Sequence, residues 1–263
     1  MAMVDVKRAG LATSPSPVIW ADCPIKRYTY NPGDGIHIWE DFTGGFVDDA
    51  SPDGKWLLVG TNPDLNKVAD EEFGVVELEG SAGDNDDSYL CSNPLYELKM
   101  NSGKRVWFEV RAKVEDEDDD HAIFAGLVES VAMATGLIAD DGAGPVDEDL
   151  IGFLAVTDAT NMGDIKSVYQ QGGDAAVTVV DSDSHSPVDD AYFKLGMKFD
   201  GAKTVTFYAD GVAVGTLDVD DLANNKMANI LGIAVGIKNC KAAAEFLSVD
   251  WIRFACDKYA LGY

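Results

Sequence analysis

Motifs that would identify a common enzyme or metal chemistry are missing from this 263-residue sequence. It contains no G-x-S-x-G nucleophile motif and no glycine-rich phosphate loop followed by Lys-Ser or Lys-Thr. No Cys-x-x-Cys pair is present, so we expect neither a zinc site nor a disulfide framework. The four cysteines are scattered: Cys23, Cys91, Cys240 and Cys256. The three histidines are equally isolated, and we interpret none as a metal ligand: His37, His121 and His185.

Positive charge is also scarce. The chain has 20 Lys and Arg against 46 Asp and Glu, which gives a net charge of −26. Nucleic acids and anionic membranes would be repelled by such a surface, so neither is an expected partner. The acidic residues lie mostly in Asp-rich stretches, which is consistent with solubility in a salty habitat or with docking onto a basic surface.

Long apolar runs are absent as well. No stretch approaches the roughly 18 residues that a membrane helix needs. The first eight residues, Met1–Arg8, lack the apolar region of a signal peptide. We therefore expect a protein that is made in the cytoplasm and is not secreted by a signal peptide.

What the sequence does contain is alternation of apolar and polar residues with a period of two. The region 192–254 predicts four consecutive β-strands, and 105–114 is the clearest single strand. Asp200-Gly201 and Asp210-Gly211 separate the first strands and predict hairpin turns. The alternation changes phase near Gly215, which indicates a bulge.

Further short strands complete an all-β pattern. We expect them at 55–61, 73–79, 95–100, 122–129, 150–156, 165–171 and 176–180. Polar loops are expected at 81–88, 115–120, 140–149 and 181–190, and residues 131–138 form either a short helix or a loop wall. Short strands separated by Gly and Asp turns predict a two-sheet antiparallel sandwich with almost no helix.

Three segments carry a family resemblance. FKLGMKFDGAKTVTFYADGVAVGTLDV, LGIAVGI and FLSVDWIRFA resemble the second half of a concanavalin A-like jelly roll. Trp39–Gly45 resembles the beginning of such domains, so the likeness covers roughly residues 39–255. This superfamily includes legume lectins, laminin-G-like modules and many β-glucanases. The resemblance implies an all-β jelly roll, but this fold hosts sugar binding, hydrolysis and purely structural roles.

Residues 1–38 differ from the predicted sandwich at 39–263. Prolines at positions 15, 17, 24 and 32 predict an extended N-terminal arm without regular structure. Trp20, Tyr28 and Tyr30 need burial, either on the protein's own sandwich or on a neighbouring subunit. The arm is also the only basic part of the chain, and its cations are Lys7, Arg8, Lys26 and Arg27.

The pattern of a glucanase active site is not found. Such an enzyme of this superfamily carries an E-x-D-x-E strand, and the nearest string is Glu115–Asp118, which lacks interleaved apolar residues and predicts a turn. Glu109 faces outward on a predicted strand, but Arg111 lies on the same face and would occupy its carboxylate. We therefore expect no catalytic residues and no enzyme activity.

Calcium and sugar binding remain open at this point. Asp84–Ser88 and Asp181–Ser184 offer alternating oxygen ligands for Ca²⁺, although neither matches an EF-hand loop and solvated loops are the simpler interpretation. Trp107, on the outward face of its strand, could stack on a sugar ring or be covered by the N-terminal arm. No cofactor other than Ca²⁺ is suggested.

An acidic jelly roll with an extended arm and no catalytic set is typical of a structural protein. By overall design the chain resembles virion proteins of tailed bacteriophages, and this resemblance implies a capsid decoration protein. Its partners would be the major capsid protein and further copies of itself, bound through Trp20, Arg27, Tyr28 and Tyr30. The alternatives are a lectin-like carbohydrate-binding module, with or without Ca²⁺, and a divergent glucanase.

Overall fold

The computed structural model describes most of the chain in ten ranges. These are residues 13–43, 56–68, 74–93, 95–97, 102–116, 120–129, 136–157, 162–173, 177–218 and 230–260. All statements about the structure refer to these residues.

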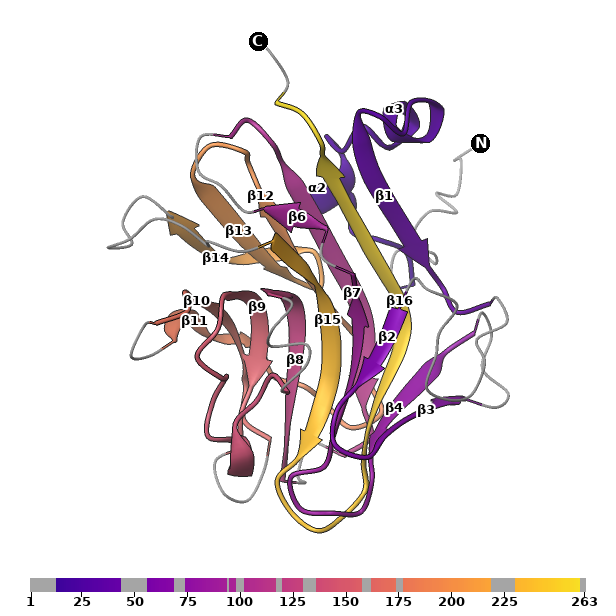
Figure 1. Cartoon of the computed structure of the whole chain (residues 1–263), viewed down its shortest axis with the longest axis vertical. Coiled ribbons are helices and arrows are strands. Elements are labelled where there is room, and N and C mark those ends of the chain that lie inside the picture. Colours follow the sequence, from indigo (N-terminus) through magenta and orange to yellow (C-terminus); the bar gives the residue numbers. More distant parts are fainter. Residues whose placement is uncertain are drawn as a thin grey trace, which may run out of the picture.

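Two antiparallel sheets make up the molecule (Figure 1). Within the described ranges, sheet A has the strand order β14-β13-β12-β7-β16-β4-β3, and β1 pairs with one end of β16 beside it. Its strands are β1 (Gly35–Glu40), β3 (Pro63–Lys67), β4 (Val76–Gly80), β7 (Val106–Val114), β12 (Phe193–Phe199), β13 (Thr204–Ala209), β14 (Val212–Asp218) and β16 (Glu245–Asp257).

Sheet B has the order β11-β10-β9-β8-β15-β5-β2, with β6 pairing to the start of β15. Its strands are β2 (Trp56–Val59), β5 (Asp87–Ser92), β6 (Tyr96–Glu97), β8 (His121–Glu129), β9 (Leu150–Ala155), β10 (Ile165–Gln170), β11 (Thr178–His185) and β15 (Ile230–Asn239). The prediction of a two-sheet antiparallel sandwich is therefore confirmed.

The main core lies between the sheets and follows from the alternation. On β7, Val106, Phe108 and Val110 point into this core, where they meet inward residues of sheet B such as Phe153 and Ile233. Alternate residues of a strand point to opposite faces, so the remaining residues of β7 lie on the outer face of sheet A. The predicted hydrophobic pattern of 105–114 is confirmed.

One turn and a bulge behave as the sequence indicates. Asp210 and Gly211 connect β13 to β14 with φ angles of 48° and 78°, the positive values that a two-residue type I′ turn requires. Phe207 pairs with Gly215 but Tyr208 pairs with Ala213, so Val214 is an extra residue. The expected bulge near Gly215 is therefore present.

The outer face of sheet B is apolar and covered. Tyr89, Phe124 and Leu154 form a second buried cluster with Leu137 and Ile138. Leu137 and Ile138 come from the segment between β8 and β9, which also contains the 3-10 helix η1 (Asp140–Gly142). Residues 131–135 of the predicted helix or loop wall lie outside the described ranges. Because both faces are covered, every residue of β8 is buried.

The loop predicted at 181–190 is partly wrong. β11 continues to His185, and Ser184 points inward, where its Oγ lies 2.6 Å from Ser167 Oγ. Within Asp181–Ser184, Asp183 N and Ser184 Oγ both donate hydrogen bonds to Asp181 Oδ1. An edge strand therefore forms in a sequence whose composition is typical of a loop.

The prediction of an extended arm without regular structure is also wrong for residues 13–38. This segment contains the helices α2 (Pro17–Trp20) and α3 (Ile25–Tyr30) and most of β1, so the expected boundary at residue 38 falls inside a strand. Pro17 occupies the first turn of α2, where its missing N–H costs nothing, and Pro24 directly precedes α3. Two of the prolines therefore begin helices.

We name residues 13–34 the N-terminal cover, because they pack on the outer face of sheet A beside β16 (Figure 1). Ile19, Trp20 and Tyr28 are buried there against Trp107 and Tyr208. Of the two docking places considered for the aromatic residues, the structure shows the protein's own sandwich for Trp20 and Tyr28.

A chain that begins at Gly35 should be markedly less stable than the full-length protein. Each fully buried large apolar side chain contributes about 1.5–3 kcal/mol, so the loss of Ile19 and Trp20 alone should amount to several kcal/mol. Urea unfolding measures this difference. A chain that begins at Thr13 retains the described cover and is the control. Equal unfolding midpoints for both truncated chains would show that the cover contributes nothing to folding.

Candidate functional site

The edge of sheet A along β1 carries the most accessible aromatic cluster of the described residues. β1 pairs with the second half of β16, so that His37 lies opposite Ala255 and Trp39 opposite Arg253. Asp250 is a bulge residue in β16, and beyond it Trp251 and Arg253 point outward. His37, Trp39, Trp251 and Arg253 therefore share the outer face.

Trp39 differs from the other tryptophans in its exposure. It is 42% exposed, whereas the other four are at most 7% exposed: Trp20, Trp56, Trp107 and Trp251. Its ring stacks on that of Trp251, with centroids 5.5 Å apart and an angle of 28° between the planes. This contact fixes one face of the Trp39 ring and leaves the residue partly accessible to a ligand.

A groove of about 290 Å³ adjoins Trp39 at the place where the edge of sheet A meets sheet B. We name it the Trp39 groove. Its lining residues are His37, Ile38, Trp39, Trp56, Ser92, Asn93 and Leu95. Trp56 and Ser92 come from β2 and β5 of sheet B. Aromatic walls combined with a few polar groups are typical of ligand sites.

The backbone of β1 contributes polar groups to this groove. Lys258 N donates a hydrogen bond to Asp34 O at the start of the β1–β16 ladder. Hydrogen-bonded and non-hydrogen-bonded pairs alternate in an antiparallel ladder, so the amide and carbonyl groups of His37 and Trp39 point away from β16. Glu40 lies at the C-terminal end of β1, where its carboxylate accepts hydrogen bonds from Trp56 Nε1 and Phe42 N, both at 3.2 Å.

Arg253 does not line the groove but contacts two of its lining residues, Trp39 and His37, from the side of the N-terminal cover. Its guanidinium carbon lies 4.2 Å from the ring centre of Trp20 and 5.5 Å from that of Trp39. Its Nε donates to His37 Nε2 at 3.4 Å. Burial, together with the neighbouring Arg253 charge, lowers the pKa of His37, so the imidazole is neutral near pH 7.

The centre of sheet A, by contrast, is occupied by the N-terminal cover. The carboxylate of Glu109 is fully buried, and it accepts hydrogen bonds from Ser16 N at 2.9 Å and from Trp20 Nε1 at 2.7 Å. Burial raises the pKa of Glu109, although these hydrogen bonds and the charge of Lys194 act in the opposite direction. A substituent at Gly196 would collide with Ile19 Cδ1, 2.5 Å from the Cβ position.

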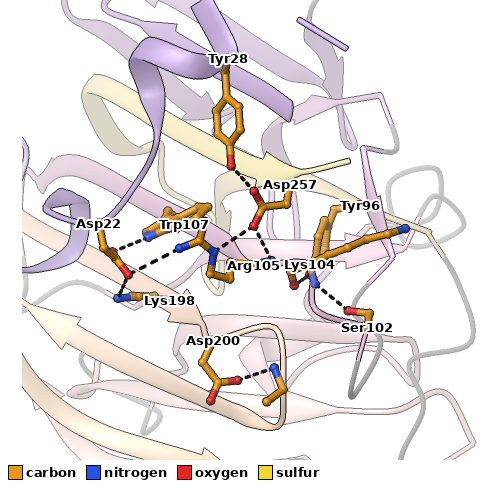
Figure 2. Close-up of polar contacts among 11 residues, drawn as sticks. Asp22, Tyr28, Tyr96, Ser102, Lys104, Arg105, Trp107, Lys198, Asp200 and Asp257 are labelled. Atoms are coloured by element: carbon orange, nitrogen blue, oxygen red, sulfur yellow. Dashed lines mark hydrogen bonds and ion pairs between the residues drawn. The ribbon is translucent and has the colours of Figure 1, made fainter. Parts of the chain in front are cut away.

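A second set of contacts fixes the cover near α3. Figure 2 shows Tyr28 donating to Asp257 Oδ1 at 2.6 Å, while Arg105 Nε donates to Asp257 Oδ2 at 2.9 Å. Asp22 accepts from Trp107 Nε1 at 3.1 Å and pairs with Lys198 at 2.6 Å (Figure 2). Burial opposes ionisation of Asp22, but the contacts with Lys198 and Trp107 outweigh it and lower the pKa of Asp22.

Three of the four predicted partner-binding residues make contacts within the protein itself. Trp20 and Tyr28 are buried within the protein, and Arg27 pairs with Asp34 at 2.6 Å in the same segment. Of the three aromatic candidates, only Tyr30 is exposed to solvent, at 88%. The further cations Lys7 and Arg8 lie outside the described ranges.

The predicted sugar platform at Trp107 is wrong. Trp107 is fully buried, and Trp20 and Tyr28 belong to the cluster that covers it. The predicted pairing of Glu109 with Arg111 is wrong as well, because Glu109 bonds to the N-terminal cover. Arg111 instead pairs with Asp250 and stacks over the Tyr192 ring at 3.7 Å. The sequence could not show that a distant segment covers this face.

The candidate calcium ligands are engaged in other contacts. Asp86 accepts from Asn62 Nδ2 and Gly83 N, and Asp87 accepts from Thr61 N. Asp181–Ser184 lies on β11 rather than in a loop. Among the described residues, no group of three or more His, Cys, Asp or Glu side chains is arranged to hold a metal ion. The interpretation of these stretches as solvated loops without Ca²⁺ stays a prediction.

None of the helices in the described ranges has the length and apolarity to cross a membrane.

Comparison with known proteins identifies the fold. No family model and no curated protein sequence matches the chain. Several solved structures do match over most of their length. The carbohydrate recognition domain of Emp47p has a TM-score of 0.54 at 12% identity, covering 85% of this chain and 97% of that one. The fold is that of the concanavalin A-like lectins and glucanases.

Two further solved structures are similar to this chain. SCLam, a non-specific endo-β-1,3(4)-glucanase of family GH16, has a TM-score of 0.54 at 12% identity, covering 85% of this chain and 92% of that one. SO2946 from Shewanella oneidensis MR-1, a protein of unknown function, has a TM-score of 0.56 at 15% identity, covering 88% and 90%. Binding proteins and enzymes thus share the architecture, which shows the fold and leaves the activity open.

The sequence does not predict the Trp39 groove. In the sequence, Trp39 only begins the segment that resembles the start of a jelly roll, and Arg253 only belongs to a predicted strand. The alternation in 245–254 could have placed Trp251 and Arg253 on one face. Nothing in the sequence shows that β1 pairs with β16 and brings Trp39 beside them.

The contact between Trp20 and Glu109 can be tested by removing a single donor. Trp20→Phe keeps an aromatic ring but leaves the buried carboxylate without its indole hydrogen bond, which should cost about 1.5–3 kcal/mol. Urea unfolding of Trp20→Phe, Glu109→Gln and the double variant measures the coupling. Strictly additive losses would contradict a direct interaction between these side chains.

Glu148 provides a pH-dependent test on sheet B. A hydrogen bond with Glu129 and burial raise the pKa of Glu148 from 4.5 to about 7. The folded protein therefore holds this proton more tightly than the unfolded chain, so its stabilising effect is present below pH 4.5 and disappears as the pH rises through 7. Glu148→Gln imitates the protonated form.

We expect Glu148→Gln to match the wild type in melting temperature at acidic pH and to exceed it above pH 7. Melting curves of both proteins across this range provide the measurement, and the difference between them removes the effect of other titrating groups. A difference that does not change with pH would contradict the raised pKa.

Proposed function

We propose that this protein is a non-catalytic, lectin-like carbohydrate-binding protein whose site is the Trp39 groove. The observation that carries the proposal is the exposed ring of Trp39, held in place by stacking on Trp251 beside a groove with polar lining. A rigid aromatic ring supplies apolar contact area at a small entropic cost, which suits the apolar face of a sugar ring.

The polar groups around Trp39 suit the hydroxyl groups of a sugar. Ser92 and Asn93 line the groove, and the outward-pointing backbone groups of His37 and Trp39 add donors and acceptors. The volume of about 290 Å³ lies near the lower end of the roughly 300–1,000 Å³ typical of ligand pockets, which suits a small unit such as one sugar residue. Emp47p, a structural neighbour, is described as containing a carbohydrate recognition domain.

We propose binding without hydrolysis because of the state of Glu109. A retaining glycosidase needs two carboxyl groups about 5–5.5 Å apart beside the scissile bond. Glu109 is the outward carboxylate at the centre of sheet A, and it is fully buried under Trp20 and Ser16. A substrate could reach it only if the N-terminal cover left the sheet.

A capsid decoration role, bound to the major capsid protein and to further copies of this chain, takes second place. This role requires an N-terminal arm that is free to bind neighbouring subunits, whereas Trp20, Arg27 and Tyr28 have partners within the chain. The exposed ring of Tyr30 is the feature that favours it, since an aromatic anchor at an interface would need such exposure. Co-sedimentation of a Tyr30→Ala variant with particles would test this alternative.

The carbohydrate proposal predicts a strong effect of Trp39→Ala. Loss of an aromatic anchor typically costs about 2 kcal/mol or more, which corresponds to roughly thirtyfold weaker binding. A glycan array identifies the ligand, and titration of the best hit gives the dissociation constants. Because the other four tryptophans are buried, a change in intrinsic fluorescence on binding should disappear in Trp39→Ala.

Tyr30→Ala is the matched control, since it removes another exposed aromatic ring outside the groove. It should bind with the same affinity as the wild type. If no glycan binds, or if Trp39→Ala binds as tightly as the wild type while both proteins melt alike, the proposed function is wrong.

A further inference from the structure

We propose that the Trp39 groove selects acidic sugars, with the guanidinium of Arg253 pairing with the carboxylate of a uronic or sialic acid residue. This inference rests on the proposed function and names its ligand class. It is drawn from the charge pairing on sheet A and from the fixed orientation of Arg253.

Four cations on or beside the outer face of sheet A form ion pairs with acidic residues of the chain. Arg111 pairs with Asp250, Lys113 with Asp190 at 3.3 Å, and Lys198 with Asp22 at 2.6 Å. Arg105 follows the same rule, pairing with Asp257. Each of these positive charges is already balanced within the protein.

Arg253 differs from these four cations. Within the described ranges it makes no ion pair, although the chain carries a net charge of −26 and hence a large excess of carboxylates. Trp20, Trp39 and His37 surround its guanidinium instead. Burial lowers the pKa of Arg253 from its usual value, although the charge of Glu109, opposite it on β7, acts in the other direction. A half-buried cation in this setting is a ready partner for an anion from outside.

The guanidinium is also held in a defined orientation. It stacks over Trp20, and its Nε donates to His37 Nε2. Since a guanidinium has five N–H donors in a planar fork, the terminal nitrogens can still donate. A carboxylate accepts two parallel hydrogen bonds from such a fork, and a charge-assisted pair of this kind is stronger than a neutral one.

Arg253 and the sugar platform adjoin each other. Trp39 lies within 5.5 Å of the guanidinium carbon and also lines the groove. A sugar ring stacked on Trp39 would therefore bring an acidic substituent within reach of Arg253. His37 is neutral near pH 7, so Arg253 supplies the positive charge at this end of the groove.

The net charge of the protein does not oppose such a short contact. Exposed charges farther apart than about 8 Å are largely screened at physiological ionic strength, whereas a direct, partly buried pair is screened much less. The acidic surface would slow the approach of a polyanion, but it would not weaken the hydrogen bonds between Arg253 and one carboxylate.

The test compares each acidic oligosaccharide with its own uncharged form. Oligogalacturonate and its methyl ester have the same ring and length, and a sialylated glycan and its methyl ester form a second pair. We expect the carboxylate forms to bind the wild type about tenfold more tightly, the ratio that 1.4 kcal/mol of additional interaction produces. A sulfated oligosaccharide is the third arm.

Variants assign this preference to one residue. Arg253→Gln should bring the affinity ratio of carboxylate to ester close to one while retaining binding of the ester. Arg111→Gln removes a paired cation from the same face and should leave the ratio unchanged. If Arg253→Gln does not fold, Arg253→Lys keeps the charge without the planar fork and should lower the ratio severalfold.

The outcomes separate the two proposals. Ester and neutral glycans that bind as tightly as the acids would overturn the acidic-sugar inference and leave the proposed function intact. Binding of sulfated but not carboxylated sugars would also overturn it. Absence of binding to any neutral or acidic glycan would overturn both. An unchanged ratio in the folded Arg253 variant would show that another group recognises the charge.

Discussion

The buried carboxylate of Glu109 is the constraint on which the outer face of sheet A depends. A fully buried acidic group is costly unless donors surround it, and here the donors come from Ser16 and Trp20, about ninety residues away in the sequence. The sheet therefore needs the N-terminal cover, and the cover has no apolar partner other than the sheet. The two fold as one unit, and the first helices belong to the sandwich.

This mutual dependence changes where a ligand can bind. The cover fills the centre of sheet A, and the segment containing Leu137 and Ile138 covers sheet B. Among the described residues, the accessible aromatic surface next to a groove lies at the edge along β1, where Trp39 stacks on Trp251. The chain thus uses a fold shared by lectins and glucanases, with a candidate site beside a closed face.

The edge of sheet A along β1 is distinguished by the charge of Arg253. Several cations on sheet A pair with carboxylates, and two of these carboxylates, Asp22 and Asp257, also fix the N-terminal cover (Figure 2). Arg253 lies between Trp20 of the cover and Trp39 of the groove, and among the described residues it makes no ion pair. The same packing that closes the centre of the sheet therefore leaves one positive group oriented beside Trp39.

Local sequence patterns were sufficient to predict most strands, because apolar residues at every second position are those whose side chains face the core. The run 105–114 predicted β7, Asp210-Gly211 predicted its turn, and the phase change near Gly215 predicted the bulge. A polar strand such as the second half of β11 shows no such alternation, because its side chains form hydrogen bonds with one another. The sequence of 181–185 therefore predicts a loop, although the structure has a strand there.

The sequence by itself thus determined the all-β sandwich and the scarcity of helix. Only the tertiary structure decided what covers each face, because Trp107, Glu109 and Trp20 reveal their contacts only when distant segments meet. The same holds for the candidate site. Trp39 and Arg253 are more than two hundred positions apart, and the pairing of β1 with β16, which no local pattern encodes, places them side by side.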